Sequence, residues 1–322
     1  MPHNVPQPII DLYDAYTHGA IDRRAFMERL ARLAGGAAAA SALLPVLAND
    51  YARAAIVDED DRRLKISTAK FDTGPIVDLI APEEIMAEGA PNAGVVPTKH
   101  LPFVTAYHAR PKTRSIAPAI IVIHENRGLN AHIKDVARRI ALEGFHVFAV
   151  DMLSPYGGTP DDEDKAREMI GKLDGDKTVA KLAAIATRLA LLKTHQRMVG
   201  AIGFCWGGGM VNRLAAASDA LVAGVSYYGR QASADEAARI RAKLLLHYAG
   251  EDERINAGIA DYESALKAAG VDYRLFMYEG AQHAFNNDTN AARYDSKAAE
   301  LAWGRTIAFF KETLKFRSGV KQ

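Results

Sequence analysis

The sequence has 322 residues but one cysteine, which excludes an internal disulfide and any zinc site built from several cysteines. It also lacks an excess of charge of either sign, because 40 Lys and Arg stand against 39 Asp and Glu. No strong electrostatic field is therefore present to attract nucleic acid or polycations. The composition favours small neutral or singly charged partners and predicts no nucleic-acid binding.

Long apolar runs and common cofactor motifs are missing too. No run reaches the roughly 18 residues that a membrane-spanning helix needs, so we predict no membrane span. There is no HExxH motif, and the segment 203–209 lacks the middle glycine of the dinucleotide fingerprint because Cys205 occupies its place. The sequence thus predicts neither a metal nor another cofactor.

The segment 1–56 differs in composition from the rest of the chain. Arg23 and Arg24 precede a small-residue apolar stretch at 34–48, and small residues at 52–54 offer a cleavage site. This pattern resembles a twin-arginine signal, which implies the twin-arginine export machinery as a partner and a periplasmic or secreted protein.

Acidic residues in this segment leave a second interpretation open. Asp22 and Glu28 dilute the positive charge, and the preface at 9–13 has a helical pattern. The alternative is therefore a pair of amphipathic helices packed on the domain of a cytoplasmic protein.

Residues 57–322 predict one α/β domain without a large lid. Beyond Pro118, apolar runs alternate with helical patterns, which is typical of a mainly parallel sheet covered on both faces. The alternating segment 103–108 predicts an antiparallel edge strand, and helices are expected around 136–140 and at about 291–316. The apolar runs that predict strands lie at 119–123, 145–150, 198–202, 221–225, 243–248 and 273–278.

A cysteine stands where a strand is predicted to meet a helix. The segment 203–207 (Gly-Phe-Cys-Trp-Gly) follows an apolar strand and precedes a helical pattern at 210–217. This is the context of a nucleophile elbow, in which flanking glycines let strand and helix backbones approach closely. A helix N-terminus also favours a thiolate. We predict that Cys205 is the nucleophile; the alternative is a buried structural cysteine beside a glycine-rich turn.

A thiol nucleophile needs a base, and the base needs a group that orients it. Asp252 follows the predicted strand 243–248, and His283 lies between the last strand and the last helix. The order nucleophile, acid, histidine is that of α/β-hydrolases. Glu251 is a rival carboxylate, but Asp252 lies where the acid of this fold usually stands. We predict a catalytic triad of Cys205, Asp252 and His283.

Four segments together resemble the dienelactone hydrolase family over roughly residues 64–316. They are 123–130 (Ile-His-Glu-Asn-Arg-Gly-Leu-Asn), the elbow at 203–208, the turn 250–252 (Gly-Glu-Asp) and 282–285 (Gln-His-Ala-Phe). The resemblance implies an α/β-hydrolase fold and a carboxylic ester hydrolase of the carboxymethylenebutenolidase type. It does not specify a substrate.

The resemblance also implies roles for residues near the first parallel strand. Glu125 would contact the resting thiol until substrate displaces it, and the backbone amides of Asn126 and Trp206 would form the oxyanion hole. His124 ends the same strand and could line the pocket, whereas His247, inside a later strand, is expected to pack in the core.

One departure from the family pattern concerns the substrate. Family members that act on dienelactone have an arginine four residues after the histidine, where this chain has Asn287. Arg127 could take over binding of a substrate carboxylate. The change leaves lactones, small esters or another activated acyl compound as candidates.

The sequence therefore predicts a hydrolase that cleaves a lactone or small ester through a thioester intermediate. Two alternatives remain: a non-catalytic ligand-binding relative, or another acyl hydrolase or peptidase on the same fold. A halide-releasing enzyme would need a carboxylate at the elbow, so Cys205 argues against it.

Overall fold

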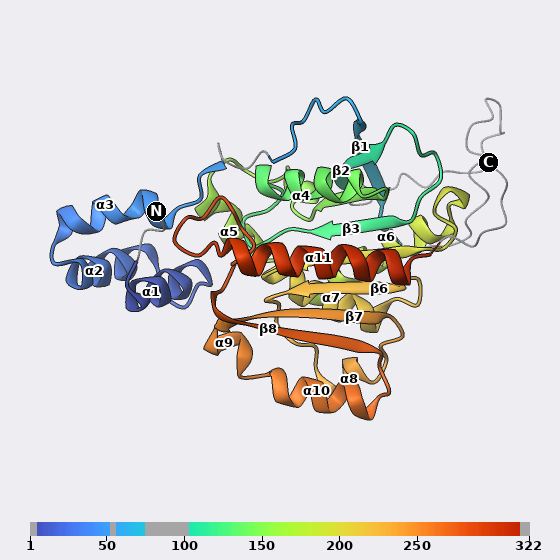
Figure 1. The fold of residues 1–322 in the computed structure, drawn as a ribbon. Helices are drawn as coiled ribbons and strands as arrows, with labels where there is room; N and C mark the ends of the chain where they lie inside the picture. Colours follow the sequence, from blue (N-terminus) through green and yellow to red (C-terminus); the bar gives the residue numbers. More distant parts are fainter. Residues whose placement is uncertain (1–4, 52–55, 75–102, 316–322) are drawn as a thin grey trace, which may run out of the picture.

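The computed structural model describes residues 5–51, 56–74 and 103–315, which form a layered α/β domain with three helices at one end (Figure 1). The strands are β1 (Leu64–Asp72), β2 (Phe103–Pro111), β3 (Ala119–Ile123), β4 (His146–Asp151), β5 (Val199–Phe204), β6 (Ala223–Tyr227), β7 (Lys243–Glu251) and β8 (Tyr273–Gln282). The helices are α1 (Gln7–Thr17), α2 (Arg23–Ala34), α3 (Ala37–Leu47), α4 (Ala131–Leu142), α5 (Glu163–Gly171), α6 (Gly175–Leu191), α7 (Trp206–Ala217), α8 (Ala234–Ala237), α9 (Glu253–Asn256), α10 (Ile259–Ala268) and α11 (Ser296–Thr313).

One eight-stranded sheet has the order β1-β2-β4-β3-β5-β6-β7-β8. Strands β3 to β8 pair in parallel, whereas β1 and β2 pair with each other and β2 pairs with β4 in antiparallel fashion. The predicted mainly parallel α/β sheet is confirmed. The segment 103–108 is antiparallel as predicted, but it is not the edge strand, because β1 covers its outer side.

One predicted strand and one predicted helix begin later in the chain than the sequence patterns suggested. Strand β6 starts at Ala223 because Leu221 closes a turn, its N–H donating to the Ser218 carbonyl at 3.2 Å. Helix α11 starts at Ser296, where the Asp295 side chain caps it by accepting from the N–H of Ala298 at 3.0 Å.

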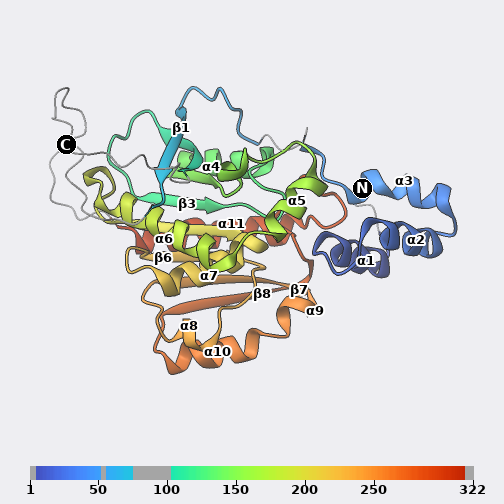
Figure 2. The same cartoon turned by 180° about the vertical axis from the view of Figure 1, so that it is seen from behind.

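Helices cover both faces of the sheet (Figures 1 and 2). Side chains of α4 and α11 pack on one face, in a cluster with Ile120, Val122 and Ile202. Those of α6, α7 and α10 pack on the other face with Ile121 and Ile123. Because neighbouring residues of β3 point to opposite faces and all five are buried, the strand sequence is continuously apolar.

The N-terminal helices α1 to α3 have a small core of their own, in which Phe26, Leu30 and Leu47 are buried. Asp22 caps α2, and Gly35, at φ 81°, ends it. These helices lie against the α/β domain, and Asn290 donates to the Leu47 carbonyl at 2.7 Å. The described part of this segment therefore folds as three packed helices; export stays a prediction.

Among the described residues, no single helix is both long and apolar enough to cross a membrane. Helices α2 and α3 have the necessary length and composition only together, and they are bent by 110° relative to each other.

Helix α7 approaches β3 so closely that a side chain has no room between them. A Cβ added to Gly207 would lie 2.3 Å from the carbonyl oxygen of Ile123 and 2.5 Å from that of His124. Both neighbours are backbone atoms at the end of β3 and directly after it, so neither can move aside without shifting the strand. The glycine at this position is therefore required by the fold.

We expect Gly207→Ala to lower the free energy of unfolding by about 3 kcal/mol or more, because the new methyl group must displace backbone. Urea denaturation would measure the change. Gly304→Ala is the matched control: this exposed glycine of α11 has open space around it, and alanine should stabilise the helix by up to about 1 kcal/mol. Equal stability of the two variants would contradict the packing argument.

Candidate active site

Cys205 occupies a strained turn between β5 and α7. Its backbone adopts φ 53° and ψ −115°, a left-handed conformation that is unusual for a residue with a side chain. The turn is tight because a Cβ on Gly203 would lie 2.1 Å from the carbonyl oxygen of Gly207. The Cys205 N–H donates to the Tyr227 carbonyl at 3.0 Å, which ties the turn to β6. The predicted elbow geometry is therefore present, and it presents the thiol at the carboxyl edge of the sheet.

His283 and Asp252 form a buried pair beside this turn. His283 follows β8, and Asp252 caps α9 directly after β7. The ring Nδ1 of His283 lies 2.5 Å from Asp252 Oδ2, and both residues are 4% exposed. Burial opposes ionisation of this carboxyl, but the adjacent imidazole outweighs burial and lowers the pKa of Asp252 below its usual value. The rival Glu251 is exposed.

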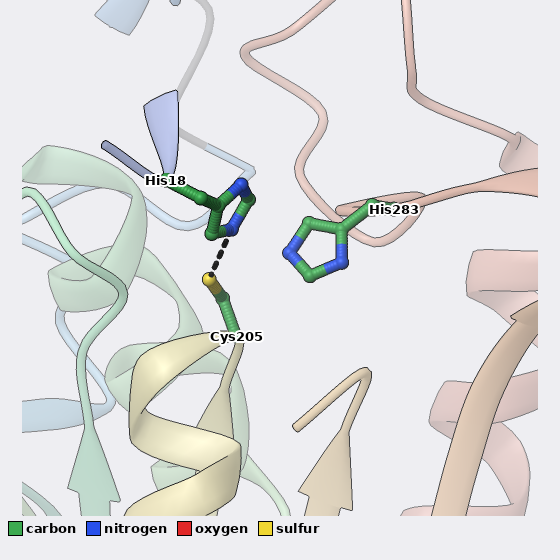
Figure 3. Close-up of side chains that lie close together, drawn as sticks. All are labelled: His18, Cys205 and His283. Carbon is green, nitrogen blue, oxygen red and sulfur yellow. Dashed lines mark hydrogen bonds between the residues drawn. The ribbon is translucent and has the colours of Figure 1, made fainter. Parts of the chain in front are cut away.

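The hydrogen-bond partner of the Cys205 thiol is a residue that the sequence had not singled out. His18, which follows α1, places Nε2 3.2 Å from Cys205 Sγ (Figure 3). A ring nitrogen of His283 points toward the same sulfur, and the sulfur and the two imidazoles have donor atoms within 4.8 Å of one another. The structure thus brings Cys205, His283 and Asp252 together and adds His18 to them.

The hydrogen bonds of Glu125 go to residues other than Cys205. Its carboxylate accepts from Asn287 Nδ2 at 2.9 Å and from the Tyr228 hydroxyl at 3.4 Å, and it is 4% exposed. In the described structure the thiol contacts His18 rather than this glutamate, in contrast to the family role expected for Glu125. Asn287, the position that departs from the family pattern, has a structural role in this arrangement, because it satisfies a buried carboxylate.

Arg127 and His124 are also engaged in buried contacts. Arg127 forms an ion pair with Glu163 at 2.9 Å and donates to the Tyr13 hydroxyl at 3.0 Å. His124 is fully buried, stacks on Trp206, and has its two ring nitrogens bonded to the backbone of Glu125 and Met152.

Asn126 and Trp206 lie beside the cysteine and line one cleft of about 1800 Å³ with it. Trp206 is the first residue of α7, so its N–H has no acceptor within the helix. The side chain of Asn126 donates to the Thr17 carbonyl at 2.6 Å, which connects this loop to the end of α1. His18, Asp14 and His283 line the same cleft.

Asp14 is the charged centre of the contact between α1 and the domain. It lies 3.2 Å from His18, 3.5 Å from Arg293 and 3.4 Å from Arg254. Burial opposes its ionisation, but His283, His18 and Arg293 outweigh burial and hold the pKa of Asp14 well below its usual range. Burial likewise opposes protonation of His18, but Cys205 and Asp14 raise the pKa of its imidazole.

A soft metal ion would find suitable donors at this site, although the sequence predicted none. Cys205, His18 and His283 are the one such cluster within the described residues, and thiolate and imidazole are the ligands that Zn²⁺ prefers.

His18 and Asp14 were missed because no local pattern marks them. They lie 187 and 191 residues before Cys205 in the chain, at the end of a segment whose composition resembled an export signal. The one available signal was the helical pattern at 9–13, which predicted α1 without showing where its end would dock.

Comparison with known proteins agrees with this geometry. A family model described as the dienelactone hydrolase family matches residues 104–314, well over half of the chain. The chain belongs to the dienelactone hydrolase family. A second model, described as YqhI-like, matches residues 2–36, which include α1 and α2.

Two curated relatives show how far the similarity extends. "Protein usf" of Aquifex pyrophilus is 35% identical over 219 residues, which cover 66% of this chain and 94% of that protein. A protein of Escherichia coli (strain K12) assigned as a carboxymethylenebutenolidase is 31% identical over 224 residues, 64% of this chain and 82% of its own length. Membership of this family supports a carboxylic ester hydrolase.

Solved structures share the fold. A crystal structure assigned as a dienelactone hydrolase of Klebsiella pneumoniae has a TM-score of 0.60 at 26% identity and covers 77% of this chain and 99% of that one. A dienelactone hydrolase-like promiscuous phosphotriesterase from metagenomic libraries has a TM-score of 0.63 at 21% identity, covering 78% of this chain and 99% of that one, and shows likeness of fold alone.

We expect Asp14→Asn to lower the free energy of unfolding by about 2 kcal/mol near pH 6, because charged hydrogen bonds are lost. The low pKa of Asp14 means that its contribution is present above about pH 3.9, the value in unfolded chains, and is lost as the pH falls further. The partner His18 has a raised pKa, so its contribution is complete below about pH 6.5 and is lost as the pH rises through the folded value.

Urea unfolding of the wild type and the variant between pH 3 and 8 would measure this difference. It should be largest between those two limits and shrink on either side. A difference that does not change with pH would contradict the ionic description of the contact.

Proposed function

We propose that the protein hydrolyses a lactone or small ester with Cys205 as nucleophile, His283 as base and Asp252 as the group that orients the histidine. The observation that carries this proposal is the buried His283–Asp252 pair beside a cysteine on a strained strand-to-helix turn. Because Nδ1 of His283 donates to Asp252, its Nε2 keeps a lone pair that can accept a proton. That nitrogen is buried without a hydrogen-bond partner among the described residues.

In the proposed reaction the Cys205 thiolate attacks the acyl carbonyl carbon, and the carbon–oxygen bond of the leaving group breaks to give a thioester. His283 then removes a proton from water, which attacks the thioester and releases the acid. The amides of Asn126 and Trp206 would stabilise the oxyanion, and each donor is worth about 3 kcal/mol of barrier. Both residues line the cleft beside Cys205, which supports this assignment.

The substrate class follows from family membership and from the cleft. A volume of about 1800 Å³ is ample for a lactone or a short ester. Arg127 is a poor candidate for binding a substrate carboxylate in this arrangement, because its buried guanidinium already pairs with the half-buried Glu163. We therefore propose substrates that do not depend on a carboxylate at that position.

We also propose that Arg23 and Arg24 belong to a twin-arginine export signal. The protein would then be periplasmic or secreted. Both belong to α2, where Arg23 pairs with Asp164 of the domain at 2.9 Å and Arg24 with Glu28 at 3.1 Å. A cytoplasmic protein with a permanently docked segment is the alternative. Fractionation of the native host followed by N-terminal sequencing would distinguish them.

Cys205→Ala should lower the turnover of p-nitrophenyl acetate by at least about 10³-fold, to the uncatalysed background, because no other thiol is present. Cys205→Ser should retain little activity, because a hydroxyl is far less acidic than a thiol. Release of nitrophenolate by purified protein measures both variants. Turnover by Cys205→Ala above background would refute the nucleophile.

The same protein can be tested against the non-catalytic alternative. Iodoacetamide should label Cys205 quickly near neutral pH and abolish turnover in parallel. Slow labelling together with no hydrolysis of a panel of lactones and short esters would favour a ligand-binding protein instead.

His283→Gln should trap the acyl-enzyme, because glutamine cannot take a proton from water. After mixing with p-nitrophenyl acetate, intact-mass spectrometry should show one added acetyl group per chain, which persists far longer than in the wild type. Cys205→Ala is the control and should carry no acetyl group. Rapid deacylation of the His283→Gln variant would show that His283 does not activate water.

A further inference from the structure

The N-terminal segment supplies a second imidazole–carboxylate pair to the cysteine. His18 Nδ1 contacts the Asp14 carboxylate at 3.2 Å and the Asp14 carbonyl at 2.8 Å, while its Nε2 contacts Cys205 Sγ at 3.2 Å. The pair of His283 and Asp252 approaches the same sulfur from the domain. Figure 3 shows the two rings beside the sulfur. Their centroids are 4.7 Å apart and their planes make an angle of 89°.

The contacts of His18 fix its tautomer. Carboxylate and carbonyl oxygens can only accept hydrogen bonds, so Nδ1 must carry a proton. Nε2 then either accepts from the thiol or, when protonated, donates to the thiolate. His18 is therefore set up to exchange one proton with Cys205.

The end of α1 is anchored on the domain, so this contact does not depend on His18 alone. The Thr17 carbonyl accepts from Asn126, the Tyr13 hydroxyl accepts from Arg127, and the Tyr16 hydroxyl donates to Asp164 at 2.7 Å. Each anchor lies within five residues of His18. The ring is consequently positioned over the sulfur by several independent contacts.

Resting on the function proposed above, we propose that His18, held by Asp14, is a second acid–base residue of the active site, contributed by the N-terminal segment. His18 takes the thiol proton and later gives it to the leaving group, while His283 acts on water. The active enzyme therefore contains residues 5–50, which lie outside the part of the chain that matches the dienelactone hydrolase family. This inference requires that the segment is not cleaved at 52–54, so it agrees with the permanently docked alternative and not with removal of an export signal.

The division of roles follows from the contacts of the two rings, because Nε2 of His18 lies 3.2 Å from the sulfur whereas Nε2 of His283 has no hydrogen-bond partner among the described residues. Two imidazolium rings at 4.7 Å in a buried site repel each other, so protonation of one keeps the other neutral. Asp14, beside Arg254 and Arg293, stabilises the cation on His18. A neutral His283 then has the free Nε2 lone pair that water activation needs.

The proton balance of the proposed cycle closes. The thiol proton moves to His18 Nε2, the thiolate forms the carbon–sulfur bond, and the leaving oxygen takes the proton from His18 as its bond to carbon breaks. Water then gives one proton to His283 Nε2 and forms the new carbon–oxygen bond. The carbon–sulfur bond breaks, and the sulfur recovers a proton from His283. The sum is ester plus water to acid plus alcohol.

A metal held by the same three side chains is the competing interpretation, and the geometry favours the hydrogen bond. A tetrahedral zinc ion with ordinary bond lengths would hold sulfur and nitrogen about 3.6 Å apart. The observed 3.2 Å between Sγ and Nε2 is closer and fits a hydrogen bond to sulfur. Zinc-dependent activity of the purified protein that chelator abolishes would overturn the proposal.

The test compares His18→Ala and His18→Gln with the wild type on two acetate esters that differ in the leaving group. Nitrophenolate departs without a proton, whereas an alkoxide from a simple alkyl acetate needs one. We expect kcat/KM for the alkyl ester to fall about 10²-fold or more, and that for p-nitrophenyl acetate to fall clearly less. Added imidazole should restore part of the alkyl ester activity of His18→Ala.

Tyr16→Phe is the matched control, because it removes the bond to Asp164 in the same segment and leaves the dyad intact. It should affect both esters equally. Equal losses for the two esters in the His18 variants, or no loss, would overturn the role of His18. Circular dichroism and urea unfolding would confirm that all variants are folded.

Failure of this inference can be told apart from failure of the proposed function. If Cys205→Ala and His283→Gln behave as stated above while the His18 variants match the wild type, the triad stands and the second dyad is wrong. If Cys205→Ala remains active, the nucleophile itself is wrong.

Discussion

The left-handed backbone at Cys205 is the constraint on which the site depends. Such a conformation costs about 1–3 kcal/mol for a residue with a side chain, so the surroundings must impose it. They do so by crowding: Gly208 has no room for a Cβ, which would lie 2.7 Å from the Tyr227 carbonyl oxygen. The same carbonyl accepts the Cys205 N–H. The strain places the sulfur where the loops after β7 and β8 bring Asp252 and His283.

Buried charge is the second organising feature, because it makes the N-terminal helices and the domain depend on each other. An uncompensated buried charge is costly, and a pair is stable only when its remaining hydrogen-bonding capacity is met. Asp14 comes from α1, whereas its cationic neighbours Arg254 and Arg293 come from the domain. In the opposite direction, Arg127 of the domain depends on Tyr13 for one of its contacts. Undocking the segment would therefore expose unpaired groups on both sides.

Much of the domain could be predicted from the sequence, because strands that are buried on both faces have continuous apolar sequences. The run 119–123 coincides with β3, and the glycines around Cys205 marked the close approach of β5 and α7. The order of Cys205, Asp252 and His283 also placed three side chains at one edge of the sheet, since parallel strands end together.

What the sequence could not predict were contacts between distant segments. Nothing near Asp14 or His18 signals that the end of α1 packs over a turn almost two hundred residues later. The partner of Glu125 was likewise not predictable, because Asn287 lies 162 residues away in the chain. The sequence marked Asn287 only as a departure from the family pattern. The structure shows that it donates a hydrogen bond to the Glu125 carboxylate. Local sequence patterns indicate secondary-structure propensity and which residues are buried. The contacts between these distant residues arise from tertiary packing, which local patterns do not show.

The position of the N-terminal segment also affects which substrates the cleft could accept. Asn287 is 1% exposed and donates to Glu125, so a substrate in the cleft does not reach it, and Arg127 is taken up by Glu163 and Tyr13. The two positions considered for carboxylate binding therefore face inward, while α1 and the turn after it form one wall of the cleft. In the proposed mechanism, discrimination between substrates then depends in part on this wall, which lies outside the region that matches the family model. Under the same proposal, relatives that lack an equivalent segment are weak guides to the substrate of this chain.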